Sequence, residues 1–320
     1  MAAFRWKSFD ENEDRPSKPR RFGVTEMRSP HHTLFSQNVL KVIPLFSSVQ
    51  FAFLLIMLLT RALTQHFVNT DIFESMGDFV DGLKFSGGCQ SLMPKATIKK
   101  IIDMAHEHDV YVSTGDWAEH TIRKSQSGFK EYVEFLIAGV VECKELGFDT
   151  IELNVSSLGV PEDTLLRFVR LVKSGGMKAK PHFEVNFNKS DIPKYADRAY
   201  GAYIPPSPRS FEYVEDVNLL IRRAERCLEA GADMIMIDAD GVSKHADNMR
   251  GDIIAKIIGR LGLEKTMFEA SNQKTSEWFI KQYGPKVNLF IDHPQVLKVE
   301  CIRGRNLGAN HVSVLGSEYF

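Results

Sequence analysis

Eight short apolar segments of strand-like composition recur along this chain, and each ends in or beside a polar or charged residue. They are GVTEM (23–27), VDGLKF (80–85), VYVSTGD (110–116), TIELN (150–154), PHFEVN (181–186), DMIMID (233–238), TMFEAS (266–271) and VNLFID (287–292). Stretches compatible with helices separate them, and apolar strands alternating with helices are typical of parallel βα architecture. Eight such units predict a single α/β domain, a (β/α)8 barrel of the TIM type.

The length and charge of the chain fit one barrel with extensions at both ends. Such barrels need about 250 residues, so we predict a flexible polar arm over 1–21, the barrel over 22–310 and a tail over 311–320. The net charge of -1 argues against nucleic acid as a partner. The arm lacks the apolar core of a signal peptide, and the four cysteines form no CxxC pair. We therefore expect a cytoplasmic protein with reduced thiols.

One apolar run does not fit the outer surface of a barrel. Residues 42–60, VIPLFSSVQFAFLLIMLLT, contain no formal charge, and they could form a transmembrane helix, an unusual core helix or an insertion. A membrane span there would separate the first predicted strand from the other seven. Residues 36–40 and 71–81 have the pattern of two halves of one amphipathic helix. We therefore favour an insertion over 41–70 that protrudes from the barrel.

The predicted strand ends are rich in acidic side chains. In this fold the carboxyl ends of the strands carry the chemistry, and here they supply Glu26, Lys84, Asp116, Glu152, Asn154, Glu184, Asp238 and Glu269. Carboxylates that converge at one mouth bind a hard cation such as Mg²⁺ through their oxygens. The predicted metal ligands are Glu152, Glu184, Asp238 and Glu269, with Glu184 the strongest candidate. The alternative for any single acid is an outward-facing or helix-capping position.

Basic residues and glycines near the same ends predict an anionic substrate. Lys84 can hold a phosphate or carboxylate, or donate a proton, and Gly87 and Gly88 can expose backbone N–H groups to an anion. Arg303 and Arg305 follow the last strand, where many barrels bind phosphate. The alternatives are a salt bridge at the rim for Lys84 and plain surface positions for the arginines. The full set of predicted substrate-binding residues is Gly87, Gly88, Asp116, Asn154, Arg303 and Arg305.

Several longer motifs resemble one enzyme family. They are LKF followed by glycines (83–88), STGDWAE (113–119), LGFDTIELN (146–154), AGADMIMID (230–238) and MFEAS (267–271). These motifs are similar to phosphosulfolactate synthase, and the likeness extends over nearly all of 22–310. It is closer still to the plant branch of that family, which is associated with heat stress and acquired thermotolerance. The resemblance implies a carbon–sulfur lyase that adds sulfite to phosphoenolpyruvate with Mg²⁺.

The resemblance also implies roles for individual residues. It assigns the family's acidic strand ends to Glu152, Glu184, Asp238 and Glu269, its strand-two lysine to Lys84 and its arginine after the last strand to Arg303. Lys189 is one residue out of register with the family's loop lysine, and Asp238 stands where the family has glutamate. Lys84, Glu184 and Lys189 are the predicted catalytic residues. Residues 41–70 and 135–141 have no counterpart, which retained intron sequence would explain.

Two classes of function therefore remain open from the sequence. One is a metal-dependent lyase that acts on a small anionic, phosphorylated substrate. The other is a non-catalytic barrel that protects or stabilises client proteins during heat stress. Neither requires nucleic acid or a membrane as a partner.

Overall fold

A closed eight-stranded parallel barrel forms the centre of the protein. The computed structural model describes residues 18–29, 72–85, 93–115, 129–154, 161–185, 198–199, 202–203, 217–239 and 251–304. The strands follow the order β1-β10-β9-β8-β5-β4-β3-β2 around the barrel. They are β1 (Thr25–Arg28), β2 (Gly82–Lys84), β3 (Tyr111–Ser113), β4 (Thr150–Asn154), β5 (Lys178–Glu184), β8 (Ile235–Asp238), β9 (Thr266–Glu269) and β10 (Asn288–Asp292). The predicted (β/α)8 fold is confirmed, with every strand close to its expected position.

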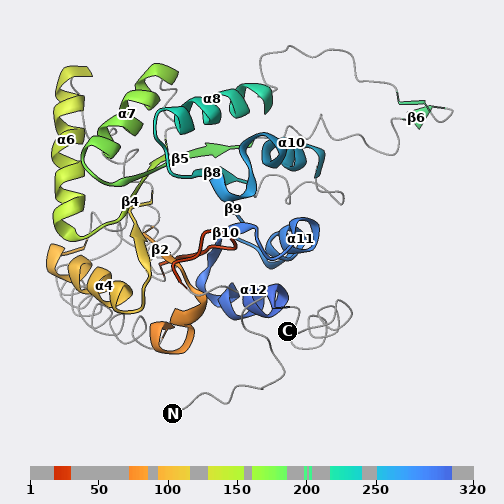
Figure 1. The fold of residues 1–320 in the computed structure, drawn as a ribbon, viewed down its shortest axis with the longest axis horizontal. Coiled ribbons are helices and arrows are strands. Elements are labelled where there is room, and N and C mark those ends of the chain that lie inside the picture. Colours follow the sequence, from red (N-terminus) through yellow and green to blue (C-terminus); the bar gives the residue numbers. More distant parts are fainter. Residues whose placement is uncertain are drawn as a thin grey trace, which may run out of the picture.

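Helices surround the barrel and connect consecutive strands, as Figure 1 shows. The α-helices are α4 (Lys95–Glu107), α6 (Phe129–Leu146), α7 (Glu162–Ser174), α8 (Val217–Glu229), α10 (Gly251–Leu261), α11 (Gln273–Tyr283) and α12 (Val296–Arg303). Short 3-10 turns are η2 (Gly77–Phe79), η6 (Leu263–Lys265) and η7 (His293–Gln295). A separate antiparallel pair, β6 (Arg198–Ala199) and β7 (Ala202–Tyr203), lies within the linker between β5 and α8.

Local sequence signals explain where these helices begin and end. Pro161 precedes α7, whose first turn carries two acidic residues that complement the positive end of the helix dipole. At the start of α11 the side chain of Asn272 accepts a hydrogen bond of 2.9 Å from the backbone of Thr275. Gly147 follows α6 with a φ of 100°, a conformation that favours glycine. The expected helices are therefore specified locally, before any packing is considered.

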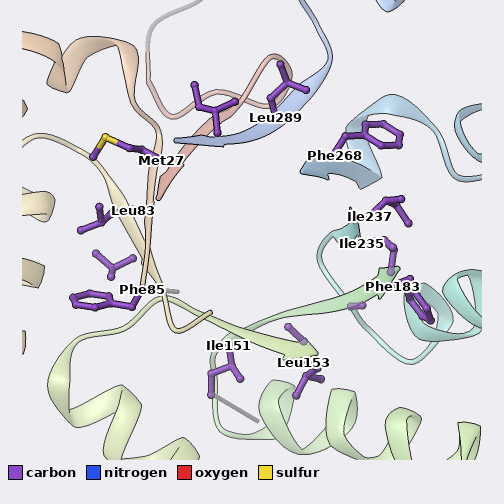
Figure 2. Packing of buried hydrophobic residues seen from close by; sticks show 14 of the residues in the cluster. Met27, Leu83, Phe85, Ile151, Leu153, Phe183, Ile235, Ile237, Phe268 and Leu289 are labelled. Atoms are coloured by element: carbon purple, nitrogen blue, oxygen red, sulfur yellow. The ribbon is translucent and has the colours of Figure 1, made fainter. Parts of the chain in front are cut away.

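Strand residues alternate between the two sides of the barrel wall. One side faces the helices with apolar side chains, and Figure 2 shows Met27, Leu83, Ile151, Leu153, Ile235, Ile237, Phe268 and Leu289 in this layer. All eight are almost completely buried, and burying such a side chain contributes roughly 1.5–3 kcal/mol. Because apolar packing between strands and helices stabilises the fold, the other side of each strand is free to bring polar groups into the barrel.

An aromatic ring and residues that precede β1 make contacts near the amino ends of the strands. Tyr111 on β3 lies against Gly82 on β2. Lys18 donates a hydrogen bond of 2.8 Å to the backbone oxygen of His108, and Arg20 forms an ion pair of 3.0 Å with Asp81. Residues 18–21 therefore contact the barrel, although the sequence placed them in a flexible arm.

The two predicted insertions differ in what the structure describes. Residues 41–70 lie outside the described residues, so the insertion there stays a prediction. Residues 135–141 lie within α6, whose backbone is helical from Phe129 to Leu146 without a break. Near the end of this segment Val140 is buried and Val141 is exposed. Among the described residues, no helix is both long enough and apolar enough to cross a membrane.

Gly82 is expected to tolerate no larger side chain, because a Cβ added there would lie 2.3 Å from Cζ of Tyr111. We expect Gly82→Ala to lower the free energy of unfolding by about 1–3 kcal/mol through overpacking. Chemical unfolding followed by circular dichroism measures this. Gly259→Ala on α10 is the matched control, since an added Cβ there meets nothing within 4 Å, and it should leave stability unchanged or raise it slightly. Equal stability of both variants would show that the tyrosine moves freely.

Candidate active site

Charged side chains from several strands converge inside the barrel. On β5, Lys180, His182 and Glu184 lie at alternate positions and therefore share one face. Glu26 on β1 and Glu152 on β4 are completely buried in the same interior. From the sequence, Glu26 is expected only among the strand ends, and Lys180 and His182 have no predicted role. Alternate residues of a strand share one face, so counting back from Glu184 in steps of two identifies His182 and Lys180 as interior residues.

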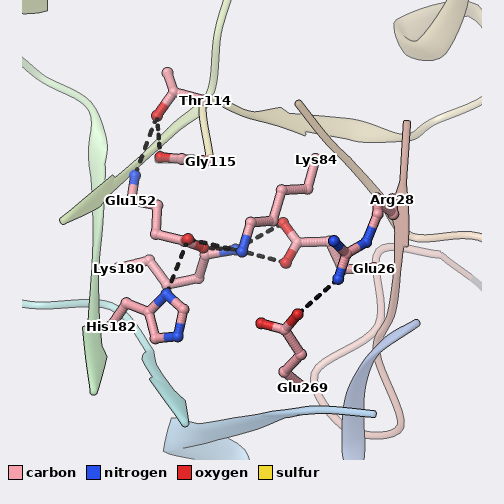
Figure 3. A network of polar contacts seen from close by, with 9 residues as sticks. All are labelled: Glu26, Arg28, Lys84, Thr114, Gly115, Glu152, Lys180, His182 and Glu269. Atoms are coloured by element: carbon pink, nitrogen blue, oxygen red, sulfur yellow. Dashed lines mark hydrogen bonds and ion pairs between the residues drawn. The ribbon is translucent and has the colours of Figure 1, made fainter. Parts of the chain in front are cut away.

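Glu152 is the centre of a buried network of polar contacts, which Figure 3 shows. Lys84 Nζ lies 2.7 Å and His182 Nδ1 3.2 Å from its Oε1, while Lys180 Nζ lies 3.3 Å from its Oε2. Burial alone would raise the pKa of Glu152, but the ammonium groups of Lys84 and Lys180 and the contact with His182 outweigh it and hold that pKa well below its usual range. Glu152 is therefore a permanent anion inside the barrel.

Lys180 joins Glu152 to a second buried carboxylate. Its Nζ lies 2.7 Å from Oε1 and 2.5 Å from Oε2 of Glu26, so Lys84, Glu152, Lys180 and Glu26 form a chain of alternating charge. The expected role of Glu152 as a metal ligand stays a prediction. Its carboxylate is already neutralised by two ammonium groups, which is the arrangement of a structural anion that positions Lys84 and His182.

Arg28 is a further interior residue without a role predicted from the sequence. It ends β1, and its guanidinium lies 2.6 Å from Oε1 of Glu269 and 2.8 Å from Oδ1 of Asp292. The Arg28 Cζ and the Lys84 Nζ lie 4.9 Å and 4.1 Å from the centre of the Phe290 ring. A partly exposed arginine thus stands beside the acids at the carboxyl ends of β1, β9 and β10.

His182, Asp238 and Glu269 form a group that could hold a metal ion, because one ligand atom from each lies within 4.8 Å of the others. Burial raises the pKa of Glu269. For His182, burial alone would lower the pKa, but the hydrogen bond and the charge of Glu152 outweigh it and raise that pKa. Two carboxylates and one imidazole fit a divalent cation. The structure thus brings together two of the predicted ligands, Asp238 and Glu269, and adds a histidine.

Glu184 and Asn154 lie at the rim where the sequence predicts them. Glu184 pairs in register with Asp238 across β5 and β8, and its side chain is exposed. Asn154 pairs with His182 across β4 and β5 and is partly buried. Both positions are compatible with contact to a ligand above the buried network. Their roles as metal ligand and substrate contact stay predictions.

Arg303 lies elsewhere than expected. It is the last residue of α12 rather than part of a loop, it is completely buried, and its guanidinium donates a hydrogen bond of 2.7 Å to the backbone oxygen of Pro285. Pro285 precedes β10, so this contact lies at the amino end of the strands, opposite the carboxylates. A phosphate bound at the mouth is therefore out of reach of Arg303. Gly87, Gly88, Asp116, Lys189 and Arg305 lie outside the described residues.

The described cysteines give no sign of a catalytic thiol. Cys143, Cys227 and Cys301 are free, in agreement with the expectation of reduced thiols for these three. Burial raises the pKa of both Cys143 and Cys227 to about 12. These two side chains are therefore neutral and contribute as apolar packing groups.

Comparisons with known proteins agree with the resemblance carried by the motifs. The family model described as (2R)-phospho-3-sulfolactate synthase matches residues 13–309. The protein HEAT-STRESS-ASSOCIATED 32 of Arabidopsis thaliana is 62% identical over 321 residues, which cover 100% of this chain and 99% of that protein. Phosphosulfolactate synthase of Methanothermobacter thermautotrophicus is 25% identical over 240 residues, which cover 73% and 82%. Among solved structures, 3-hexulose-6-phosphate synthase from Salmonella typhimurium aligns with a TM-score of 0.45 and 12% identity over 74% of this chain and 92% of that one.

Two of these findings decide the family. The family match begins inside the predicted arm and continues beyond the last described helix. The relative from Arabidopsis thaliana is similar over the whole chain. The chain therefore belongs to the phosphosulfolactate synthase family.

Proposed function

We propose that this barrel catalyses a metal-dependent addition of sulfite to phosphoenolpyruvate or to a related small, phosphorylated anion. In that reaction the sulfur of sulfite bonds to the methylene carbon, and the double-bond electrons move toward the neighbouring carbon and its carboxylate. A proton must then reach that carbon. The observation that carries the proposal is the Lys84 ammonium, which is 2% exposed and held 2.7 Å from Glu152 at the end of β2. A positioned proton donor of this kind is what the second step requires.

Three groups of residues at the mouth of the barrel would have different roles: proton delivery, anion binding and metal binding. Lys84, fixed by Glu152, delivers the proton. Arg28 at the end of β1 takes the anion-binding role that the sequence gave to Arg303, because it is the arginine found beside the rim acids in the described part of the chain. Asp238 and Glu269, with Glu184 in register with Asp238 at the rim, would hold Mg²⁺. The bound ion would stabilise the negative charge that develops on the substrate carboxylate.

A second candidate is a protective heat-stress protein without turnover. The relative that is 62% identical is named for its association with heat stress, and one structural observation favours this reading. Lys84, Lys180, Glu26 and Glu152 already neutralise one another without any ligand. Networks of ion pairs contribute more to stability as temperature rises, because the desolvation penalty falls. In this case the partners would be client proteins, and the cytoplasm would be the place of action.

An assay of product formation tests the enzyme proposal and compares two lysine substitutions. Phosphorus NMR follows the full chain with phosphoenolpyruvate, sulfite and Mg²⁺. We expect the parent to form a phosphorylated sulfonate product. The rate of Lys84→Met should be lower by a factor of about 10² or more, because general acid catalysis contributes at least that much. Lys99→Met on α4 is the control, since Lys99 is exposed and, among the described residues, pairs only with Asp103 along its own helix.

The two candidate functions separate in a plant line that lacks its own copy. Under the enzyme proposal, Lys84→Met should fail to restore heat tolerance while Lys99→Met restores it. Full restoration by an inactive Lys84→Met protein would show that the plant uses the barrel for protection. A parent protein that binds Mg²⁺ but forms no product would rule out the sulfite reaction directly.

A further inference from the structure

The two ring nitrogens of His182 have different surroundings: Nδ1 contacts Glu152, and the ring also lies near Asp238 and Glu269 at the mouth of the barrel. Its Nδ1 lies 3.2 Å from Oε1 of Glu152. Its Nε2 makes no hydrogen bond to any residue of the described part of the chain, although the side chain is 7% exposed. With Nδ1 in contact with Glu152, Nε2 is the ring nitrogen of His182 that remains available to a ligand.

The surroundings of this nitrogen are those of a metal ligand. Asp238 and Glu269 each place a carboxylate oxygen within 4.8 Å of a His182 ring nitrogen and of one another. Two ligands on opposite sides of one ion are about 4 Å apart, twice a typical metal–ligand distance. Arg28 donates a hydrogen bond to Oε1 of Glu269, and Oε2 of Glu269 accepts none from the described residues. One ion can thus join the three side chains after small rotations.

Glu152 adds the supporting contact that metal-bound histidines generally have. A ligating imidazole donates its other N–H to a carboxylate, which selects the tautomer, orients the ring and makes the ring nitrogen a stronger donor. Here Glu152 is itself held in place by Lys84 and Lys180 at 2.7 Å and 3.3 Å. The orientation of the His182 ring is therefore determined by a buried network and not by the metal alone.

We infer that Nε2 of His182, with Asp238 and Glu269, binds a divalent first-row transition metal in preference to Mg²⁺. Mg²⁺ favours oxygen ligands, whereas imidazole suits the transition metals. The inference rests on the metal site of the proposed function but not on the sulfite reaction. It also predicts a nitrogen ligand, which an all-carboxylate Mg²⁺ site lacks.

Mn²⁺ is the probe, because it is paramagnetic and accepts both oxygen and nitrogen ligands. The tag-free full chain is titrated with Mn²⁺ by electron paramagnetic resonance, and pulsed measurements detect coupling to a ¹⁴N nucleus. We expect tight binding with ¹⁴N coupling, and displacement by Mg²⁺ only at an excess of about tenfold or more. In His182→Asn the amide keeps a donor near the Nδ1 position but removes Nε2. This variant should lose the ¹⁴N coupling, and its preference for Mn²⁺ should fall by about tenfold or more.

A second histidine supplies the control. His106 also contacts a carboxylate, Asp149 at 2.9 Å, but it is exposed on α4, so His106→Asn should change neither the coupling nor the preference. Mn²⁺ binding by the parent without ¹⁴N coupling would overturn the histidine ligand while leaving an oxygen-ligated Mg²⁺ site intact. Absence of binding by both ions would overturn the metal site of the proposed function as well. The parent spectrum decides the question even if His182→Asn does not fold.

Discussion

Lys180→Met is expected to lower the free energy of unfolding by about 3–5 kcal/mol, because it leaves a buried carboxylate without its cation. Glu26 is completely buried, and Lys180 contacts both of its carboxylate oxygens. Glu152 would lose one of its two ammonium partners as well but would keep Lys84. Methionine matches the length of the lysine stem, so the loss reports the charge more than the packing. Chemical unfolding of the variant and the parent at the same pH measures the difference.

A double variant separates the cost of an unpaired charge from the value of the pair. Replacing a whole buried ion pair by apolar residues of similar volume is often neutral or stabilising. We therefore expect Glu26→Leu combined with Lys180→Met to recover most of the stability that the single variant loses. Lys178→Met is the control, since Lys178 is exposed on the same strand, and its effect should be about 0.5 kcal/mol or less. A double variant as unstable as the single one would mean that the pair contributes far more than its own neutralisation.

The barrel was predictable because each strand carries a short apolar run between helix signals. The expected and observed strands coincide at 150–154 and differ by a few residues elsewhere. The largest difference is at β5, where the predicted segment begins at Pro181. The observed strand begins at Lys178 and includes Pro181. That shift is why Lys180 was not recognised as an interior residue.

The site was only partly predictable, for a different physical reason. Sequence places Asp238 and Glu269 at the ends of strands, and the closed barrel brings them together with His182. Which acid remains available for a ligand depends on the cations across the barrel. Lys180 on β5 reaches Glu26 on β1, a contact between residues 154 apart in the chain. The register of a closed barrel decides such contacts, and no local pattern reports them.

Arg303→Ala is expected to destabilise the protein by about 3 kcal/mol, although the sequence placed this arginine at the surface. The side chain is completely buried at the end of α12 and donates to the backbone oxygen of Pro285 at 2.7 Å. Truncation leaves a cavity comparable to that of a large core residue and removes the donor from a carbonyl group. Arg303→Met keeps most of the stem and should lose about 1–2 kcal/mol, which isolates the hydrogen bond. Thermal and chemical unfolding measure both variants.

The same variants decide whether Arg303 binds phosphate. Arg260→Ala is the matched control, because Arg260 also lies in the last turn of a helix but is exposed and contacts Glu225; it should change stability by about 0.5 kcal/mol or less. Since Arg303 contacts the amino end of β10, the folded fraction of Arg303→Ala should bind a phosphorylated ligand as tightly as the parent. If Arg303→Ala binds the phosphorylated ligand more weakly but is as stable as the parent, Arg303 is a phosphate-binding residue after all. Lower stability with unchanged binding would leave Arg28 as the arginine at the mouth of the barrel.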